Sequence, residues 1–413
     1  MIIKKEKILI FYALSVLILS IFLVDKNVID NLLYGMDMQL FYVAVSINKS
    51  TIVLFISGIT FLVIMLFNKK ISIDIILIFL LIRLVMSLIP LMYSVSDQFW
   101  GSYITQVIDL LVYMIARNTL LSKCGEDRLL SLVRIAAIIV CIQVVLTFLS
   151  IIEVLPYLNI SYKSLMIIPY GGSNYISTFL VPFLFAYQFS SYDGKKKIDV
   201  IIISFIILTI ILTKSRFGIL MVIIYSIFIL FTLNKKVFNK NNEKFKVLLL
   251  FMNVIFVYFI FMFFSKYSNS FYEIMIGFSN TVNDGGLLNK LSSGRINIIT
   301  QYFDKIMSSP LWGHGPAYEF GEKRAHNLLI DIFYQSGVIG FAFLIISFVF
   351  WIRLVKKNLN DKFIAFSYYF CIIMIINSMF EISIFTAFSS DFLFFTFLGL
   401  STAKASYLNK LNQ

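Results

Sequence analysis

The sequence predicts an all-α, polytopic membrane protein with about twelve transmembrane helices. Hydrophobic residues make up 60% of its 413 residues and charged residues only 14%, whereas a soluble domain is roughly half apolar and a quarter charged. The apolar residues form successive runs of about 17–25, the helix length that crosses a bilayer. Short clusters of Lys and Arg separate these runs, as is typical of membrane proteins. We therefore expect one integral membrane domain over residues 1–413.

The predicted spans follow one another from the N-terminus. The first apolar run starts behind Lys4, Lys5 and Lys7 and has no small-residue cleavage signal, so it is interpreted as a retained helix and not as a signal peptide. The apolar stretch 38–47 is short and is interpreted as interfacial. The spans are placed at 7–24, 51–67, 71–93, 102–120, 129–154, 173–190, 199–213, 217–233, 247–264, 327–350, 363–380 and 385–402.

The basic residues support the number of spans. With a cytoplasmic N-terminus and twelve spans, the Lys and Arg clusters between spans fall on the cytoplasmic side, as the positive-inside rule requires. Removing one span would place all later clusters outside. The sequence therefore predicts a multi-pass membrane protein with both termini in the cytoplasm. The clusters are 69–70, 123–128, 195–197, 235–246, 353–362 and 404–410.

Composition and cysteine spacing argue against several other classes. The net charge of +13 does not indicate nucleic-acid binding, because the basic residues lie in the clusters that orient membrane helices. Cys124, Cys141 and Cys371 are scattered, so neither a disulfide framework nor a metal site is indicated. We expect no nucleic-acid partner and no metal.

One predicted outer loop, 265–326, is far longer than the usual connection of about 4–6 residues. Loops of this length are usually functional or disordered, and the many aromatic and aliphatic residues here argue against disorder. Ser292 or Ser293 can cap a helix over 294–308. Such an amphipathic helix is expected to lie along the membrane surface or to pack on the bundle. Its apolar face would contain Ile296, Ile299, Tyr302 or Phe303, and Ile306 or Met307.

Basic residues on the predicted outer side are candidates for phosphate binding. Lys214 and Arg216 lie between two spans in Thr213–Leu220, and Arg295 follows Ser293–Gly294 at the start of the loop helix. Arg binds phosphate oxygens with paired hydrogen bonds, and a helix N-terminus attracts anions. The alternatives are side chains that anchor the chain at the headgroups and a plainly capped surface helix.

A second cluster opens the predicted span at 327. Lys323 and Arg324 precede His326 and Asn327, and neighbouring cations favour a neutral imidazole that can accept a proton. Gly337 and Gly340 are expected to admit a neighbouring helix or a lipid chain. The alternative is an interfacial histidine that caps a helix. Upstream, the glycines and prolines of Pro310–Pro316 predict an irregular turn, in which His314 is interpreted as structural.

Ionisable residues also occur in or beside other spans. Arg83 and Asp109 lie in apolar surroundings, where an unpaired charge is costly, so they are expected to pair structurally. Glu381 and Asp391 flank the last outer turn. Glu381 is a candidate acceptor of hydrogen bonds from a substrate, and its alternative is simple exposure at the interface.

These motifs, in this order, resemble the O-antigen ligase and Wzy-type polysaccharide polymerase family of bacterial envelope enzymes. The resemblance covers about 170–345 by motif and the whole chain by topology. One departure is Lys214, where small residues are more usual. The matching segments are Gly172–Asn174, Arg216-x3-Leu220, Ser293–Gly294–Arg295, Pro310 with Gly313–His314–Gly315, and His326–Asn327-x9-Gly337-x2-Gly340.

The resemblance implies a GT-C-like, metal-independent glycosyltransferase without a cofactor. It would lie in the bacterial cytoplasmic (inner) membrane with its active site facing the periplasm or exterior. Its donor would be an undecaprenyl-diphosphate-linked oligosaccharide. Arg216 and Arg295 would hold the diphosphate, and His326 would orient or deprotonate the acceptor hydroxyl. The further expected substrate-binding residues are Lys214, Lys323, Arg324, Asn327 and Glu381. Membrane lipids are expected partners, with a chain-length regulator and a flippase as further candidates.

Three functions compete. A polymerase would add the growing glycan to a lipid-linked repeat unit, and this function is favoured by analogy with the broader branch of the family. A ligase would attach the finished glycan to lipid A core or to a protein. A transporter or flippase would show paired halves, broken helices and charges near the midplane, and no internal repeat is found. A pure scaffold would have no need for the outer polar cluster.

Overall fold

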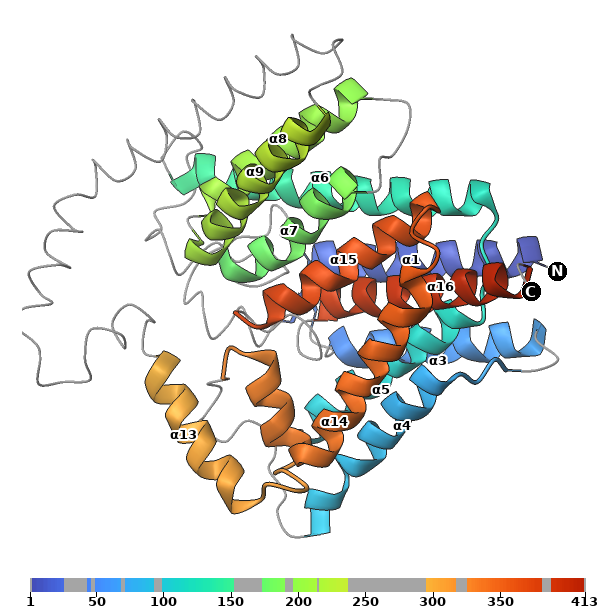
Figure 1. Ribbon diagram of the computed structural model, residues 1–413, viewed down its shortest axis with the longest axis vertical. Coiled ribbons are helices and arrows are strands. Elements are labelled where there is room, and N and C mark those ends of the chain that lie inside the picture. The colour runs from blue at the N-terminus through green and yellow to red at the C-terminus, as the bar shows by residue number, and fades with distance from the viewer. Residues whose placement is uncertain are drawn as a thin grey trace, which may run out of the picture. The chain divides into compact units, whose positions relative to one another are not determined.

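The computed structural model describes a largely helical chain (Figure 1). The residues described are 2–25, 43–45, 49–67, 71–92, 99–151, 173–189, 196–213, 215–236, 295–316, 325–380 and 388–411. The helices are α1 (Ile2–Phe22), α3 (Lys49–Phe67), α4 (Ile75–Met86), the 3-10 turn η1 (Ile89–Met92), α5 (Phe99–Arg117), α6 (Lys123–Ile151), α7 (Ser173–Phe189), α8 (Lys196–Leu212), α9 (Arg216–Lys236), α13 (Arg295–Ser308), α14 (Leu328–Lys356), α15 (Lys362–Ser378) and α16 (Phe388–Leu411).

The helices confirm the predicted helical class. Each predicted span that falls within the described residues coincides with a helix, and the span at 247–264 lies outside them. Within the described residues, four helical segments are long and apolar enough to cross a membrane. They are Ile75–Met92, Phe99–Arg117, Lys123–Leu146 and Leu328–Lys356, and shorter apolar helices accompany them. The total of twelve spans and their orientation stay predictions.

Two short strands depart from the all-helical expectation. β1 (Leu23–Asp25) pairs in parallel with β2 (Val43–Val45). β2 lies within the apolar stretch 38–47, which the sequence placed at the membrane interface. Three residues are too few for a span, since a helix needs about 20 residues and a tilted strand about 9–11 to cross the hydrocarbon.

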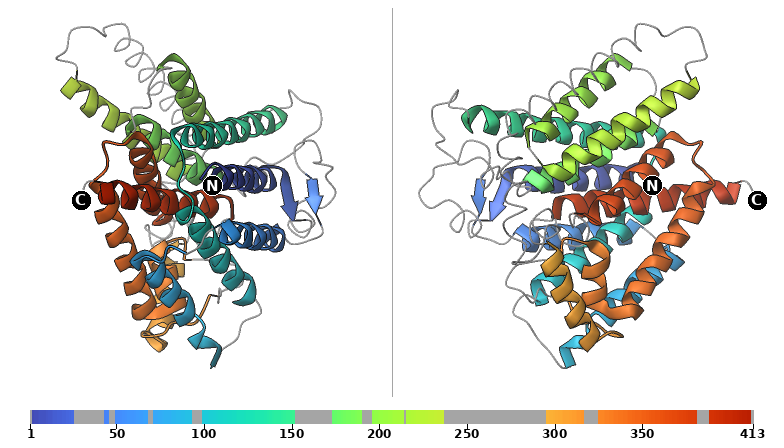
Figure 2. Two further views of the ribbon diagram at one scale, coloured as in Figure 1. Left: turned by 90° about the vertical axis from the view of Figure 1, so that its right-hand side faces the viewer. Right: turned by 60° about the vertical axis from the view of Figure 1, so that its left-hand side comes forward.

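The chain forms two compact units. Unit 1 contains Met1–Ile219 and Asp304–Gln413, and unit 2 contains Leu220–Phe303. In unit 1, α1 packs against α3, α6 and α16, and α5 lies between α3 and α16 (Figures 1 and 2). α14 packs along α4, while α15 lies against α7 and α16. Phe183, Phe370 and Phe397 lie in contact at the centre of this second group.

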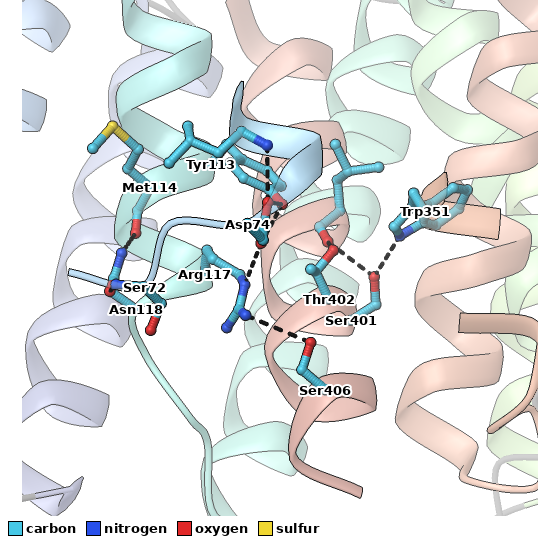
Figure 3. Close-up of polar contacts among 12 residues, drawn as sticks. Ser72, Asp74, Tyr113, Met114, Arg117, Asn118, Trp351, Ser401, Thr402 and Ser406 are labelled. Carbon is cyan, nitrogen blue, oxygen red and sulfur yellow. Dashed lines mark hydrogen bonds and ion pairs between the residues drawn. The ribbon is translucent and has the colours of Figure 1, made fainter. Parts of the chain in front are cut away.

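One end of unit 1 is held together by ion pairs between helix ends. Arg117 Nε donates to Asp74 at 2.5 Å, and the Tyr113 hydroxyl donates to the same carboxylate (Figure 3). Lys404 bridges Glu126 at 2.6 Å and Asp361 at 2.7 Å. These contacts join the start of α4, the ends of α5 and α16, and the starts of α6 and α15. Segments that the charge pattern assigns to one side of the membrane therefore lie together.

Candidate functional site

The Pro310–Pro316 turn is built into a break in α14. Gly337 has φ 60° and ψ −169° within this helix, so the amides of Val338 and Ile339 cannot reach the carbonyls four residues earlier. They donate instead to Pro310 O at 2.9 Å and Leu311 O at 3.4 Å. The helix therefore bends at Gly337 without leaving these two backbone donors unsatisfied. Figure 1 shows the bend in α14.

The carbonyls released by the break are satisfied from the same turn. Tyr334 O accepts from the His314 amide at 2.8 Å, and Gln335 O accepts from the Gly315 amide at 2.9 Å. Two bonds of the helix are thus replaced by four bonds to the turn. We call this arrangement, residues 309–315 with 334–339, the α14 junction.

Glycine is required on both sides of the α14 junction. Gly313 has φ 74°, and a Cβ there would lie 2.6 Å from the backbone of Gln335 to Gly337. A Cβ on Gly337 would overlap the carbonyl of Leu311. The expectation that Gly337 admits a neighbouring helix or a lipid chain is wrong, because the turn's own backbone fills that space. At Gly340 the expectation of a neighbouring helix holds, because a Cβ there would lie 3.8 Å from Cγ of Arg83 in α4, besides contacting Ser336 of its own helix.

His314 fastens the end of α13 to the α14 junction. Its Nε2 lies 2.8 Å from Lys305 O, a carbonyl that can only accept, so Nε2 carries the proton. Its ring stacks on Tyr334 with a centroid distance of 4.9 Å. These contacts agree with the structural role interpreted for His314. On α13 itself, Tyr302 and Ile306 are buried while Phe303 and Met307 are exposed, which resolves the two alternatives left open for the apolar face.

His326 and Asn327 form a tight turn onto the N-terminus of α14. His326 is half-buried and has φ 52°, in the left-handed region. Among described residues it is the only one other than glycine with positive φ. Such a conformation costs roughly 1–3 kcal/mol and clusters at functional sites. A hydrogen bond stabilises the turn: Ala325 N donates to Oδ1 of the buried Asp331 at 3.4 Å.

Asn327 holds the turn from both sides. Its Oδ1 caps α14 by accepting from the amides of Leu329 at 3.0 Å and Ile330 at 3.3 Å. Its Nδ2 donates to Met379 O at 2.9 Å, just beyond the end of α15. Asn327 therefore positions His326 relative to two helices. The cap of α14 is Asn327 and not His326, which differs from the alternative of a capping histidine.

The residues around Arg216 form a second capped helix start. Ser215 is buried, and its Oγ accepts from the Gly218 amide at 3.1 Å at the first turn of α9. The same hydroxyl donates to Asn174 Oδ1 at 2.8 Å. Thr213 Oγ1 lies 3.1 Å from Ser177 Oγ. Asn174 and Ser215, which come from two separate segments of the sequence pattern, thus meet where α7 and α9 begin.

Two contacts connect this helix start with the His326–Asn327 turn. Phe217 stacks on Phe380 with a centroid distance of 5.4 Å, and Phe380 follows Met379, whose carbonyl binds Asn327. Asn377, fully buried, donates to Thr178 O at 3.4 Å. The N-termini of α7, α9 and α14 therefore converge with the end of α15. Helix N-termini carry partial positive charge, so this end of unit 1 is suited to an anion. We call it the convergent end.

The predicted site residues fall into three groups. His326 and Asn327 lie at the convergent end, and Arg216 is the first residue of α9 there. Arg295 is the first residue of α13 and belongs to unit 2. The remaining predicted residues, Lys214, Lys323, Arg324 and Glu381, lie outside the described residues.

A buried pair of glutamine side chains at the α14 junction was not identified from the sequence. Gln106 Nε2 donates to Gln335 Oε1 at 3.0 Å, and both side chains are buried. Arg83 and Asp109 are buried as well, at 3% and 2% exposure, and attract each other electrostatically without forming an ion pair within 4.0 Å among the described residues. In the sequence, Gln106 and Gln335 each place an uncharged amide within an apolar run. A search for ionisable residues alone overlooks these amides.

Asn327→Ala is expected to lower the free energy of unfolding by about 1–2 kcal/mol, because a helix cap is lost together with the bond to Met379 O. Asn327→Asp keeps the cap but places a carboxylate against that carbonyl, so we expect intermediate stability. The measurement is thermal unfolding of the purified protein in detergent. Equal melting temperatures for all three proteins would show that the cap contributes nothing.

A protein-family model matches the part of the chain that contains most of this candidate site. Residues 201–345 match the family model described as O-antigen ligase. A search of curated proteins finds no match. The matched segment contains the start of α9, α13 and the α14 junction with its capped turn. The match therefore supports the ligase and polymerase family and a glycosyltransferase-like enzyme of the membrane, and it does not single out a polymerase.

Proposed function

We propose that this protein transfers a glycan from a polyprenyl diphosphate donor to a sugar hydroxyl, as a polysaccharide polymerase. The observation that carries the proposal is the convergence of two separate motifs, Arg216 at the start of α9 and His326–Asn327 at the start of α14. The contacts Phe217–Phe380 and Met379–Asn327 link them. A transfer of this kind needs positive charge for the leaving diphosphate and a proton acceptor for the attacking hydroxyl.

In the proposed mechanism, Arg216 and Arg295 bind the diphosphate through charge-assisted hydrogen bonds, and Lys214, Lys323 and Arg324 add positive charge. The acceptor hydroxyl oxygen attacks the anomeric carbon from the face opposite the diphosphate. The bond from that carbon to the diphosphate oxygen breaks, and its electron pair stays on the diphosphate. His326 receives the hydroxyl proton. The configuration at the anomeric carbon is inverted, and no metal takes part in these steps.

Asn327 and Glu381 have supporting roles in this proposal. Asn327 fixes the strained backbone that presents His326, which is a positioning role. Glu381 follows Phe380, the partner of Phe217, and would accept hydrogen bonds from sugar hydroxyls. The wider partners would be a flippase that delivers the donor and a regulator of chain length.

Ligation is the second candidate, favoured by the match of 201–345 to the O-antigen ligase model. It uses the same donor and the same chemistry and differs in the acceptor. Transport is less well supported. A broken helix is present in α14, but transporters use broken helices to line a substrate site near the midplane. Here the four hydrogen bonds of the α14 junction occupy the break.

The decisive experiment removes the gene in its host and examines surface glycans and lipid-linked intermediates on gels. The complementing proteins are wild type, Arg216→Ala, Arg295→Ala and His326→Ala, with Arg128→Ala, an exposed arginine at the start of α6, as the charge-matched control. A polymerase is indicated by loss of the long-chain ladder while single repeats remain on the acceptor or the lipid. A ligase is indicated by long chains that stay on the lipid carrier. Unchanged glycans after deletion would overturn the proposal.

A pair of substitutions at His326 separates chemistry from folding. Glycine adopts φ 52° without strain, so His326→Gly is expected to be more stable than His326→Ala by about 1 kcal/mol. Both variants lack the proton acceptor, and we expect each to lose at least about 100-fold in transfer rate. The measurements are melting temperature and transfer of labelled lipid-linked glycan by the purified protein. Activity that follows stability, with His326→Gly close to wild type, would exclude His326 as the base.

A further inference from the structure

A cationic cavity lies at the end of α14 opposite the convergent end. Its volume is about 560 Å³, and it is open to the surface. Leu328, at the start of α14, adjoins the His326–Asn327 turn, whereas the cavity lies at the last turn of the same helix, 29 residues long. It is therefore separate from the proposed transfer site. The residues that line it are Phe350, Arg353, Leu354, Lys356, Lys357 and Asn409.

Three cations lie on one face of the cavity. Arg353, Lys356 and Lys357 are exposed and follow i, i+3, i+4 spacing, which places them together on the helix surface, where like charges repel. Within the described part of the chain, no carboxylate forms an ion pair with any of them. By contrast, Arg117 and Lys404 at the same end of unit 1 are both paired. A bound anion would relieve the repulsion among the three cations.

The remaining walls of the cavity are apolar or carry an amide. Phe350 is held by stacking on Phe79 with a centroid distance of 5.9 Å, and Leu354 lies one turn further along α14. Asn409 Oδ1 accepts from Asn358 Nδ2 at 2.9 Å, so the amide nitrogen of Asn409 is the group that remains to donate. The cavity thus combines donors and positive charge with an aromatic and an aliphatic surface.

We infer that this cavity binds the phosphate group of an anionic phospholipid such as phosphatidylglycerol. Arg353 donates paired hydrogen bonds to the phosphate oxygens, and the two lysines act as point charges beside it. Phe350 and Leu354 contact the start of an acyl chain. A soluble phosphate ester offers the same oxygens, but it leaves the apolar wall in water. The inference concerns a lipid site on the protein and goes beyond glycan transfer.

The test uses the purified full-length protein in mixed micelles and measures binding of phosphatidylglycerol and of phosphatidylcholine. The variant carries Arg353→Gln, Lys356→Gln and Lys357→Gln. The matched control carries Lys7→Gln, Lys123→Gln and Arg128→Gln, which removes the same charge from exposed residues on α1 and α6. We expect the cavity variant to lose about tenfold or more in affinity for phosphatidylglycerol and the control to stay within about twofold.

Two outcomes would overturn the inference. Equal losses in the cavity variant and in the control would show that phosphatidylglycerol responds to general surface charge. Competition by glycerol 3-phosphate as strong as that by phosphatidylglycerol would show a soluble phosphate site and not a lipid site. Size-exclusion elution and melting temperature establish that both variants are folded, as their exposed positions lead us to expect. Glycan transfer is not the readout, so failure here leaves the proposed function standing.

Discussion

Gly337→Ala is expected to destabilise the protein by more than about 3 kcal/mol. The backbone at Gly337 (φ 60°, ψ −169°) lies in a region that is essentially accessible only to glycine, where any other residue costs roughly 1–3 kcal/mol. In addition, the new Cβ would overlap the Leu311 carbonyl, a backbone group held by the bond to Ile339. Relieving the overlap requires breaking the α14 junction and leaves its amides and carbonyls, among them those of the buried Tyr334 and Gln335, without partners.

Thermal unfolding in detergent and glycan transfer should both report this change. Gly58→Ala is the matched control, because a Cβ at Gly58 in α3 meets no atom within 4 Å, and alanine is favoured over glycine in a helix by up to about 1 kcal/mol. We therefore expect Gly58→Ala to be neutral or slightly stabilising. A Gly337→Ala protein as stable as Gly58→Ala would show that the break in α14 is not glycine-dependent.

Arg83→Leu is expected to lower the free energy of unfolding by about 3 kcal/mol. Both Arg83 and Asp109 are buried, and removing the arginine leaves the Asp109 carboxylate in apolar surroundings without the charge that attracts it. Breaking a buried pair from one side typically costs about 3–5 kcal/mol, whereas replacing both partners with apolar residues is often neutral. The double variant Arg83→Leu with Asp109→Leu should therefore recover most of the stability.

Unfolding of the two single variants and the double variant in detergent forms a thermodynamic cycle. Recovery in the double variant gives a coupling energy between the two sites, even though they form no close ion pair in the described structure. Losses that simply add would contradict the pairing predicted from the sequence. The same cycle with Gln106→Leu and Gln335→Leu tests the neighbouring amide pair, for which we expect a smaller coupling of about 1 kcal/mol.

The helices could be predicted because each apolar run is long and bounded by charge or by turn residues. The run at 327–350 contains a feature that hydropathy did not predict, the break at Gly337. Its composition indicates one continuous span, and the two glycines within it suggest only close packing. The break at Gly337 depends on hydrogen bonds to Pro310 and Leu311, more than twenty residues earlier in the chain, and hydrophobic periodicity contains no information on that pairing.

The candidate site was found from the sequence only in part. Arg216, His326 and Asn327 were named from residue type and position. Ser215, Asn174, Phe217 and Phe380, which bring them together, were not identified as contacts, because a cap between two helix starts or an aromatic stack depends on distance in space. The positive φ of His326 is likewise a property of the folded turn, and backbone strain of this kind clusters at functional sites.

The sequence by itself determined the helical membrane class, the grouping of basic residues and the segments proposed to carry the chemistry, since all three follow from hydropathy, charge and residue type along the chain. Only the tertiary structure decided that α14 is broken and repaired by the Pro310–Pro316 turn. It also decided that the starts of α7, α9 and α14 converge. The physical reason is that hydrogen bonds released at a break, and N–H groups left at helix starts, are satisfied by whichever groups the fold brings near.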